Sequence, residues 1–528
     1  MKSSDQFWFD LLDSRLSRRD LLRVARDVSG IIALGTLSGS AANARQLPRL
    51  RANPFTFGIA SGDPWPESVV LWTRLDRIAL QQIGHNAGPA SVQWEVAEDD
   101  GFRQIVSRGT ASAIDRLGYS VHVEVNGLRP ARPYWYRFHG GGVSSPIGRT
   151  RTAPAVAAAI DSLRLVVASC QKYTEGFYTA YRHIASEDID LILHLGDYIY
   201  EQAEPENPVR RQVLGEPHTL EEYRARYTLY RLDSDLQAAH AVAPWIVTFD
   251  DHEVDNNYAD EIPEDERQTG QFPLRRTAAY QAYYEFMPLR RSSLPRGRDM
   301  QIYRRFDWSR LARFHVLDTR QYRSNQPCGD GQKQRCSGAT DPAATMMGTT
   351  QENWLYDGLR TSGARWNTLA NQALIAQLSR NEPAGRTFPM DMWDGYVAAR
   401  QRLLSFIAER RPSNPVVLTG DIHSNWVADL KADFDDPRSP AVATEFAGTS
   451  ISSGGDGRDV SPRTAAILAD NPHIKFYNGQ RGYLRCQITP ERWTTDIRIV
   501  PYVVRPGAPI STRASFVVQN GEAGAVPG

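Results

Sequence analysis

The segment PWIVTFDDHE (residues 244–253) places an apolar run, Pro244–Phe249, directly before two aspartates, a histidine and a glutamate. A continuous apolar run of this length is typical of a strand that is covered on both faces, as in a parallel sheet. Three carboxylates around one histidine repel one another unless a cation lies among them or one of them is neutralised. The segment therefore predicts a buried strand that ends at a metal site.

The same arrangement, an apolar run followed by polar groups, recurs elsewhere in the chain. The further groups are Cys170 after Leu163–Ser169, Asp197 and Tyr200 after Ile189–Leu195, and Asp421 and His423 after Pro415–Thr419. Ligands of open α/β sheets bind in the crevice beyond the carboxyl ends of the strands. We therefore expect these side chains to meet Asp250, Asp251 and His252 at one edge of the fold, where a pair of cations would offset their repulsion.

Between residues 160 and 510, strand-like runs alternate with segments of helical spacing, which predicts a domain of the α/β (α+β) class. The predicted helices are Phe177–Ser186, Leu220–Tyr230, Arg275–Phe286 and Met392–Glu409. The additional predicted strands are Arg313–Asp318, Ala441–Phe446, Ile474–Tyr477, Gly482–Ile488 and Thr494–Ile499. Residues 511–528 are expected to form a flexible tail.

Residues 50–152 have a different pattern, with short alternating runs and glycine-rich turns such as Gly140–Gly142. Alternation of this kind predicts half-buried antiparallel strands and a small β-sandwich before the α/β domain. Leu128–Tyr134 resembles the corner of fibronectin-type sandwiches, in which a tyrosine hydroxyl bonds to nearby backbone.

Residues 1–44 resemble a twin-arginine signal peptide. Arg18 and Arg19 precede the moderately apolar stretch Val28–Leu37 and an A-x-A site at Ala42–Ala44, although an amphipathic N-terminal helix is the alternative. The signal predicts recognition by the twin-arginine export machinery and a periplasmic or secreted protein. Because no later run approaches the roughly 18 apolar residues that span a bilayer, no transmembrane anchor is expected.

The overall charge argues against binding to nucleic acid or to anionic lipid. Lysine plus arginine and aspartate plus glutamate each total 61 in 528 residues, so the chain has no net field that would attract such partners. Cys328 and Cys336 lie in a polar insertion, residues 325–341, and an exported compartment favours a disulfide between them. Cys486 lies in a strand-like segment and is expected to be buried. We expect a monomer.

The motifs together resemble a known enzyme family. Gly196-Asp197-x-x-Tyr200, Asp250–Glu253 and Gly420–His423 resemble motifs of the calcineurin-like metallophosphoesterases, in particular the purple acid phosphatases. With Ser169-Cys170, Leu317–Arg323, the twin-arginine pattern and the N-terminal sandwich, the chain most resembles the PhoD-type alkaline phosphatase/phosphodiesterase family. The resemblance implies a metallophosphoesterase fold, with sheets packed face to face and flanked by helices.

The resemblance also implies two metal centres. Cys170, Asp197, Tyr200 and His423 would hold Fe(III), and Asp197 would bridge to a second ion, expected to be Ca²⁺. The expected ligands of the second ion are Asp251, Asp421 and, on weaker grounds, Asn257. Ligand chemistry agrees, because calcium takes oxygen donors whereas thiolate, phenolate and imidazole suit a transition metal.

The second ion could also be Mg²⁺, Mn²⁺ or Zn²⁺, because the wider superfamily has a fourth-motif histidine that this chain lacks. Residues 366–377 are the region where that histidine would stand, with Asn371 and Gln372 as candidates.

The implied reaction is hydrolysis of phosphomonoesters and phosphodiesters, by attack of a metal-bound hydroxide on phosphorus. His252 is the candidate for transition-state stabilisation or leaving-group protonation, and Asp250 or Glu253 would orient it. Arg320 either binds the substrate phosphate or forms a surface salt bridge. The alternatives are a phospholipase D-like phosphodiesterase and, more remotely, an inactive cell-wall-binding module.

Overall fold

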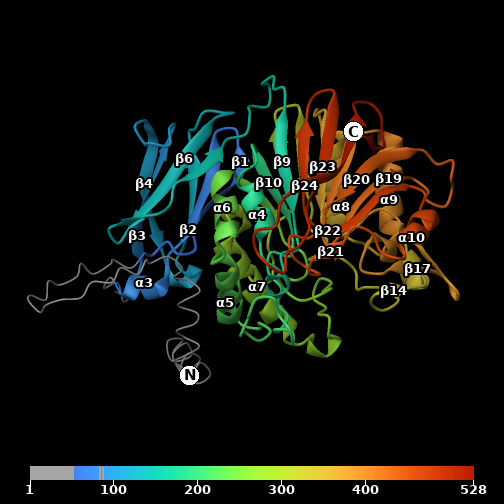
Figure 1. Cartoon of the computed structure of the whole chain (residues 1–528), viewed down its shortest axis with the longest axis horizontal. Helices are drawn as coiled ribbons and strands as arrows, with labels where there is room; N and C mark the ends of the chain where they lie inside the picture. Colours follow the sequence, from blue (N-terminus) through green and yellow to red (C-terminus); the bar gives the residue numbers. More distant parts are fainter. Residues whose placement is uncertain (1–52, 83–84, 86–87) are drawn as a thin grey trace, which may run out of the picture. The chain divides into compact units, whose positions relative to one another are not determined.

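The structure is a computed structural model that describes residues 53–82, 85 and 88–528. Its N-terminal region forms a two-layered β-structure (Figure 1). One layer contains β4 (Ile105–Ala113), β3 (Ala90–Ala97), β6 (Pro133–Gly140), β7 (Val143–Ser144) and β8 (Gly148–Arg151). The other contains β1 (Ile59–Trp65), β2 (Ser68–Arg74) and β5 (Ser120–Asn126), and a short helix, α3 (Arg77–Gln82), follows β2. Their apolar side chains form one shared core, so the predicted β-sandwich is confirmed. The predicted signal peptide, residues 1–44, lies outside the described residues.

The predicted tyrosine corner is also present in this region. The Tyr134 hydroxyl accepts a hydrogen bond of 2.9 Å from the backbone N–H of Arg129. The N-terminal region is not a separate sheet system, however. Gly62 in β1 pairs in parallel with Trp245 in β11, so the sandwich continues directly into the region that follows it.

The region that follows the sandwich contains two large sheets. The first sheet has three parallel strands followed by four antiparallel ones: β11 (Trp245–Thr248), β10 (Leu191–Leu195), β9 (Leu163–Ala168), β22 (Ile474–Ile488), β23 (Arg492–Val500), β24 (Ser511–Gln519) and β25 (Val526–Pro527). The second sheet contains β12 (Arg304–Trp308), β13 (Ala312–Val316), β15 (Trp366–Asn371), β18 (Pro415–Thr419), β20 (Ala441–Ala447) and β19 (Asn425–Lys431). The first residues of β22 pair with β19, which joins the two sheets.

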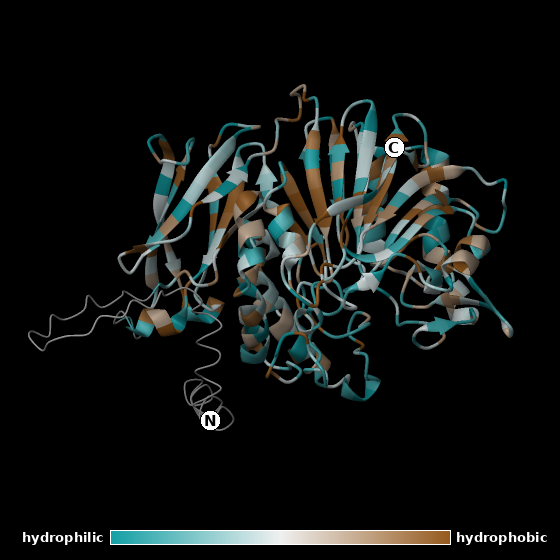
Figure 2. Ribbon diagram, in the orientation of Figure 1, coloured by the Kyte–Doolittle hydropathy of each residue, from teal (hydrophilic) through white to brown (hydrophobic). Residues whose placement is uncertain are grey.

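The sheets pack face to face around a continuous apolar core. Val167 and Leu193 from the first sheet belong to the same buried cluster as Phe314 and Leu418 from the second. Figure 2 shows this apolar character along the central strands. The central strands β10 and β18 are buried along their whole length, and burial on both faces favours apolar sequence over alternation.

Helices cover the outer faces of both sheets. Those whose residues pack with the first sheet are α4 (Thr179–Ile184), α5 (Leu220–Arg231), α6 (Ser234–Val242) and α7 (Phe272–Phe286). Those that pack with the second are α8 (Gly348–Arg360) and α9 (Val397–Arg410), and the short α10 (Thr464–Asp470) lies near the small sheet of β14 (Gln332–Lys333), β17 (Gly385–Pro389) and β16 (Arg380–Glu382). The two-residue strand β21 (Gly457–Arg458) pairs with β22. This architecture of two packed sheets between helices is the expected fold class.

The predicted flexible tail is wrong. Residues 511–519 form β24, which pairs along its length with β23. Phe516 and Val518 enter the core between the sheets, and their burial stabilises the strand by about 2 kcal/mol each. The strand is not evident from the sequence, because its first residues, Ser511–Arg513, are polar and exposed and only its later residues are apolar.

Both cysteine predictions are confirmed. Cys328 and Cys336 form a disulfide, and Cys486 is buried. No helix within residues 53–82 and 88–528 combines the length and the apolar character that crossing a membrane requires.

Candidate metal centre

The loops after four buried strands bring their polar side chains together. Cys170, Asp197 and His423 each offer one donor atom to a group whose atoms all lie within 4.8 Å of one another. Asp197 also belongs to a second such group, with Asp250, Asp251 and Asp421. Two donor groups that share one carboxylate are what a bridged pair of ions requires.

Tyr200 lies against the first group. Its hydroxyl is 2.8 Å from Oδ2 of Asp197 and 2.9 Å from Nε2 of His423. The Ser453 hydroxyl donates to the phenol oxygen at 2.8 Å and also bonds to the carbonyl of Cys170. The structure therefore brings together the four residues predicted for the first ion.

The backbone of these loops is held in an uncommon conformation. The non-glycine residues Cys170, Asp197, Asn257, Asp421 and His423 all have φ between 52° and 60°. Left-handed backbone costs an ordinary residue about 1 kcal/mol or more, and it persists at functional sites when the surrounding fold determines it. The sharp turn after each strand aims the side chain back at the sheet edge.

The donor groups fit cations, because several of their atoms are buried without a hydrogen-bond partner. These atoms are Asp197 Oδ1, Asp250 Oδ2, Asp251 Oδ1 and Asp421 Oδ2. Burial, together with the neighbouring aspartates, raises the pKa of Asp250 and of Asp421 well above the ordinary value. Orphaned carboxylate oxygens are rare in native proteins, and bound cations account for such clusters.

The thiol and the phenol point to the same conclusion. Burial and the nearby Asp197 raise the pKa of Cys170 and of Tyr200 well above their ordinary values. Both groups would stay protonated without a strong local positive charge, and a bound metal ion deprotonates such ligands outright.

Glu253 connects the loop after β10 to the loop after β11 through hydrogen bonds to the backbone. Its carboxylate accepts backbone N–H groups from Asp197 at 3.0 Å, from Tyr198 at 2.6 Å and from Asp250 at 2.9 Å. Glu253 therefore shapes the cluster through the backbone and does not bond to His252. The expectation that Asp250 or Glu253 orients this imidazole is wrong.

The partner of His252 is Glu201. The Glu201 Oε2 atom lies 2.7 Å from Nδ1 of His252, and both side chains are buried. Burial alone would lower the pKa of His252, but Glu201 and Asp251 raise it well above 6.5. Sequence analysis missed Glu201, although its place directly after Gly196-Asp197-x-x-Tyr200 marks it as part of the same loop.

Arg320 neither binds at an open site nor forms a surface ion pair. Its side chain is fully buried, and its guanidinium bonds to both oxygens of Asp391 at 2.9 Å and to Oδ1 of Asp250. Asp251 lies 3.4 Å away. The donors that would bind a substrate phosphate are thus committed to carboxylates, and Arg320 balances the charge of the cluster. Asp391 had not been predicted.

The side chains of the three remaining candidates, Asn257, Gln372 and Asn371, do not belong to either donor group. Asn257 donates its backbone N–H to Asp251 at 2.8 Å, whereas its side-chain amide donates to Asp330 at 2.9 Å. Gln372 uses its amide to tie together the strand ends at Thr248, Phe249 and Leu317. Asn371 keeps a buried Oδ1 atom without a hydrogen-bond partner.

Comparisons with known proteins identify relatives that match most of this chain. The family model described as "PhoD-like phosphatase" matches residues 165–497, and the model for its N-terminal domain matches residues 40–154. The chain is 47% identical over 520 residues to alkaline phosphatase D of Bacillus subtilis (strain 168), covering 97% of this chain and 89% of that protein. A solved structure titled "Structure of PhoD" has 49% identity and a TM-score of 0.87, covering 91% of this chain and 93% of the other. This chain belongs to the PhoD-like phosphatase family.

Proposed function

We propose that the protein is an exported, metal-dependent phosphohydrolase that cleaves phosphomonoesters and phosphodiesters. The observation that carries the proposal is the set of donor groups that share Asp197, among them the Cys170 group and the all-aspartate group. In addition, one buried oxygen on each of four aspartates lacks a hydrogen-bond partner. The similarity to alkaline phosphatase D supports the same reaction class.

The donor sets favour two different ions. Cys170, Tyr200 and His423 offer sulfur, phenol oxygen and imidazole, which suit Fe(III). Asp250, Asp251 and Asp421 offer only carboxylate oxygen, which suits Ca²⁺, with Mg²⁺, Mn²⁺ or Zn²⁺ as alternatives. When bound, the ions supply positive charge for the phosphate oxygens and activate a water for attack on phosphorus.

His252 supplies the proton chemistry of the proposed reaction. Because Nδ1 bonds to Glu201, the proton available for transfer is on Nε2. The charge and hydrogen bond of Glu201 raise the pKa of His252, which favours the protonated ring. His252 can therefore donate a hydrogen bond, or a proton, to the leaving oxygen of the ester, and Glu201 positions it.

Export through the twin-arginine pathway and a monomeric state complete the proposal. Replacing Arg18 and Arg19 with lysine should retain the precursor inside the cell, as measured by fractionation. Gel filtration with light scattering of the exported protein should give the mass of one processed chain, which lies below the 59.2 kDa of the full sequence.

The activity is tested with p-nitrophenyl phosphate and bis(p-nitrophenyl) phosphate, together with metal analysis of the same preparation. We expect p-nitrophenol from both esters, one iron per chain, and a visible absorption band that Tyr200→Phe removes. Release from neither ester would contradict the phosphohydrolase, and a colourless protein that contains only zinc would contradict the iron. A strong preference for the diester would favour a phosphodiesterase of the phospholipase D type.

A further inference from the structure

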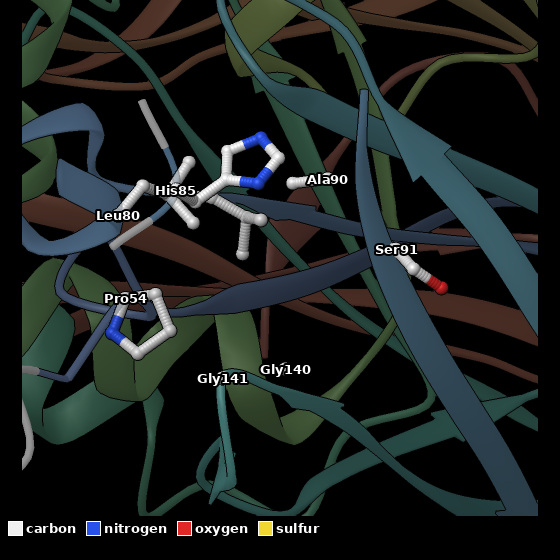
Figure 3. Close-up of a pocket in the computed structure, with 8 residues that line it drawn as sticks. Pro54, Leu80, His85, Ala90, Ser91, Gly140 and Gly141 are labelled. Atoms are coloured by element: carbon white, nitrogen blue, oxygen red, sulfur yellow. The ribbon is translucent and has the colours of Figure 1, made fainter. Parts of the chain in front are cut away.

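A cavity of about 380 Å³ opens directly beside the metal centre. Asp421, a member of the all-carboxylate donor group, lies in its wall. The cavity is therefore adjacent to any substrate phosphate held at the ions. A second cavity of about 280 Å³ lies in the N-terminal sandwich, where it is lined by Pro54, Leu80 and His85 among others (Figure 3). Of these two cavities, the first is the one that adjoins the donor groups.

One wall of the cavity beside the metal centre is aromatic and rigid. The rings of Trp426 in β19 and Tyr477 in β22 pack edge to face, with centroids 4.6 Å apart. The Trp426 indole N–H donates to the Ser424 hydroxyl at 2.8 Å, which fixes the ring. Ile422 and Met392 extend the apolar lining. A wall of this kind binds a ring or a hydrocarbon chain by contact and by displacement of water.

Another part of the lining is cationic, and one of its two arginines, Arg380, has no carboxylate partner among the described residues. Arg380, the first residue of β16, lines the cavity, and its Nε atom is buried without a hydrogen-bond partner. Among the described residues, no carboxylate lies within ion-pair distance of Arg380. Arg463 also lines the cavity and is 73% exposed, with Glu382 at 4.0 Å as its ion-pair partner. Arg380 as a whole is half-buried, so its guanidinium remains accessible, and an anionic ligand group in the cavity would supply the partner that Nε lacks.

We propose that this cavity is the subsite for the alcohol portion of the substrate. It prefers phosphate esters whose alcohol has an aromatic or apolar body and a second anionic group, which Arg380 recognises. The volume is at the lower end of the roughly 300–1,000 Å³ of small-molecule sites, so it accommodates one ring system. The inference rests on the proposed function, because it assigns the substrate class of the same site.

The test compares kcat/KM for phenyl phosphate and for 4-carboxyphenyl phosphate in the wild-type protein and in Arg380→Gln. Both rates come from one preparation, so the fraction of folded or metal-loaded protein cancels in their ratio. The intrinsic reactivities of the two esters cancel when the ratios of the two proteins are compared. Arg380→Gln should lower the carboxyphenyl-to-phenyl ratio about tenfold, the size expected for one charge-assisted hydrogen bond.

Arg386→Gln is the matched control. Arg386 lies on the neighbouring strand β17 and pairs with Asp435 at 2.9 Å, outside the cavity lining. Its substitution should leave the ratio at the wild-type value. An unchanged ratio in Arg380→Gln, or an equal fall in both variants, would overturn the assignment.

A second readout does not need turnover. Binding of 4-hydroxybenzoate, measured by calorimetry on the metal-loaded protein, should weaken about tenfold in Arg380→Gln and stay unchanged in Arg386→Gln. Equal binding to all three proteins would refute the subsite. The two failures are therefore distinct: absence of phosphate release from either ester counts against the phosphohydrolase, whereas insensitivity of both ratio and binding to Arg380 counts against the subsite alone.

Discussion

Replacing Arg320 with glutamine distinguishes two roles of this residue, which are to neutralise the buried carboxylates around it or to bind the substrate phosphate. The guanidinium is fully buried and contacts Asp250 and Asp391, with Asp251 at 3.4 Å. Removing one partner of a buried ion pair leaves uncompensated charge and costs about 3–5 kcal/mol. Unfolding entropy of about 2.1 cal/mol/K per residue, taken over the described chain, gives about 1 kcal/mol/K. We therefore expect the Tm of Arg320→Gln to fall by about 3–5 °C.

Arg313→Gln is the control for this change. Arg313 makes a two-bond contact with Asp307, at 2.6 and 3.1 Å, but both side chains are partly exposed. Exposed pairs contribute about 0.2–1 kcal/mol, so its Tm should fall by no more than about 1 °C. Thermal melting followed by fluorescence, with metal analysis and steady-state kinetics on the same samples, provides the measurement. A variant Arg320→Gln with wild-type Tm and metal content but a KM raised tenfold would refute the reasoning and restore a substrate-binding role.

The remaining predictions concern proton transfer, acid stability and the loop after β10. His252→Gln should lower kcat by about 10²–10⁴-fold. Because Glu201 raises the pKa of His252, Glu201→Gln should move the alkaline limb of the pH–rate profile to lower pH. An unchanged alkaline limb would contradict the pairing of Glu201 with His252. Burial lowers the pKa of His194 to about 3 and of His473 to about 4. As the pH falls below 6.5, these two histidines therefore become protonated in the unfolded state before they do so in the folded state. The free energy of unfolding should fall by about 2 kcal/mol for each histidine between pH 7 and pH 5. An unchanged urea midpoint at pH 5 would contradict this. Gly196→Ala would place a methyl group 2.4 Å from Cβ of Asp250, at φ +105°, and should reduce metal content and activity together; wild-type values of both would show that the loop can adjust.

The fold was predictable where burial leaves a simple pattern. Strands β9, β10, β11 and β18 are covered on both faces, so each is largely apolar, apart from Arg164 in β9 and His194 in β10. The predicted limits of these strands lie within two residues of those observed. Strands β12 and β19 were missed, because polar residues such as Asp307 and Asp429 alternate with the apolar ones. Helix α6 was missed because its short sequence carries only a weak apolar stripe. Helix α8 was missed although it is amphipathic; it begins at Gly348 without a side-chain cap, so no start signal marks it in the sequence.

The site was predictable to the extent that it depends on strand ends. Cys170, Asp197, Asp421 and His423 each follow a buried strand directly, and parallel strands bring such positions to one edge. The partners of His252 and Arg320 could not be inferred in the same way. Glu201 and Asp391 reach the cluster from loops whose paths depend on tertiary packing, and no periodicity encodes those paths.

The order of strands in the first sheet also bears on how the chain is synthesised. β9 pairs with β22 about three hundred residues later, and β24 at residues 511–519 adds Phe516 and Val518 to the same core. A nascent chain cannot complete this core while its last segment is still inside the ribosome. Folding is therefore dominated by contacts of high sequence separation and is expected to be slow, and a product released before residue 511 would expose apolar surface to proteases and chaperones.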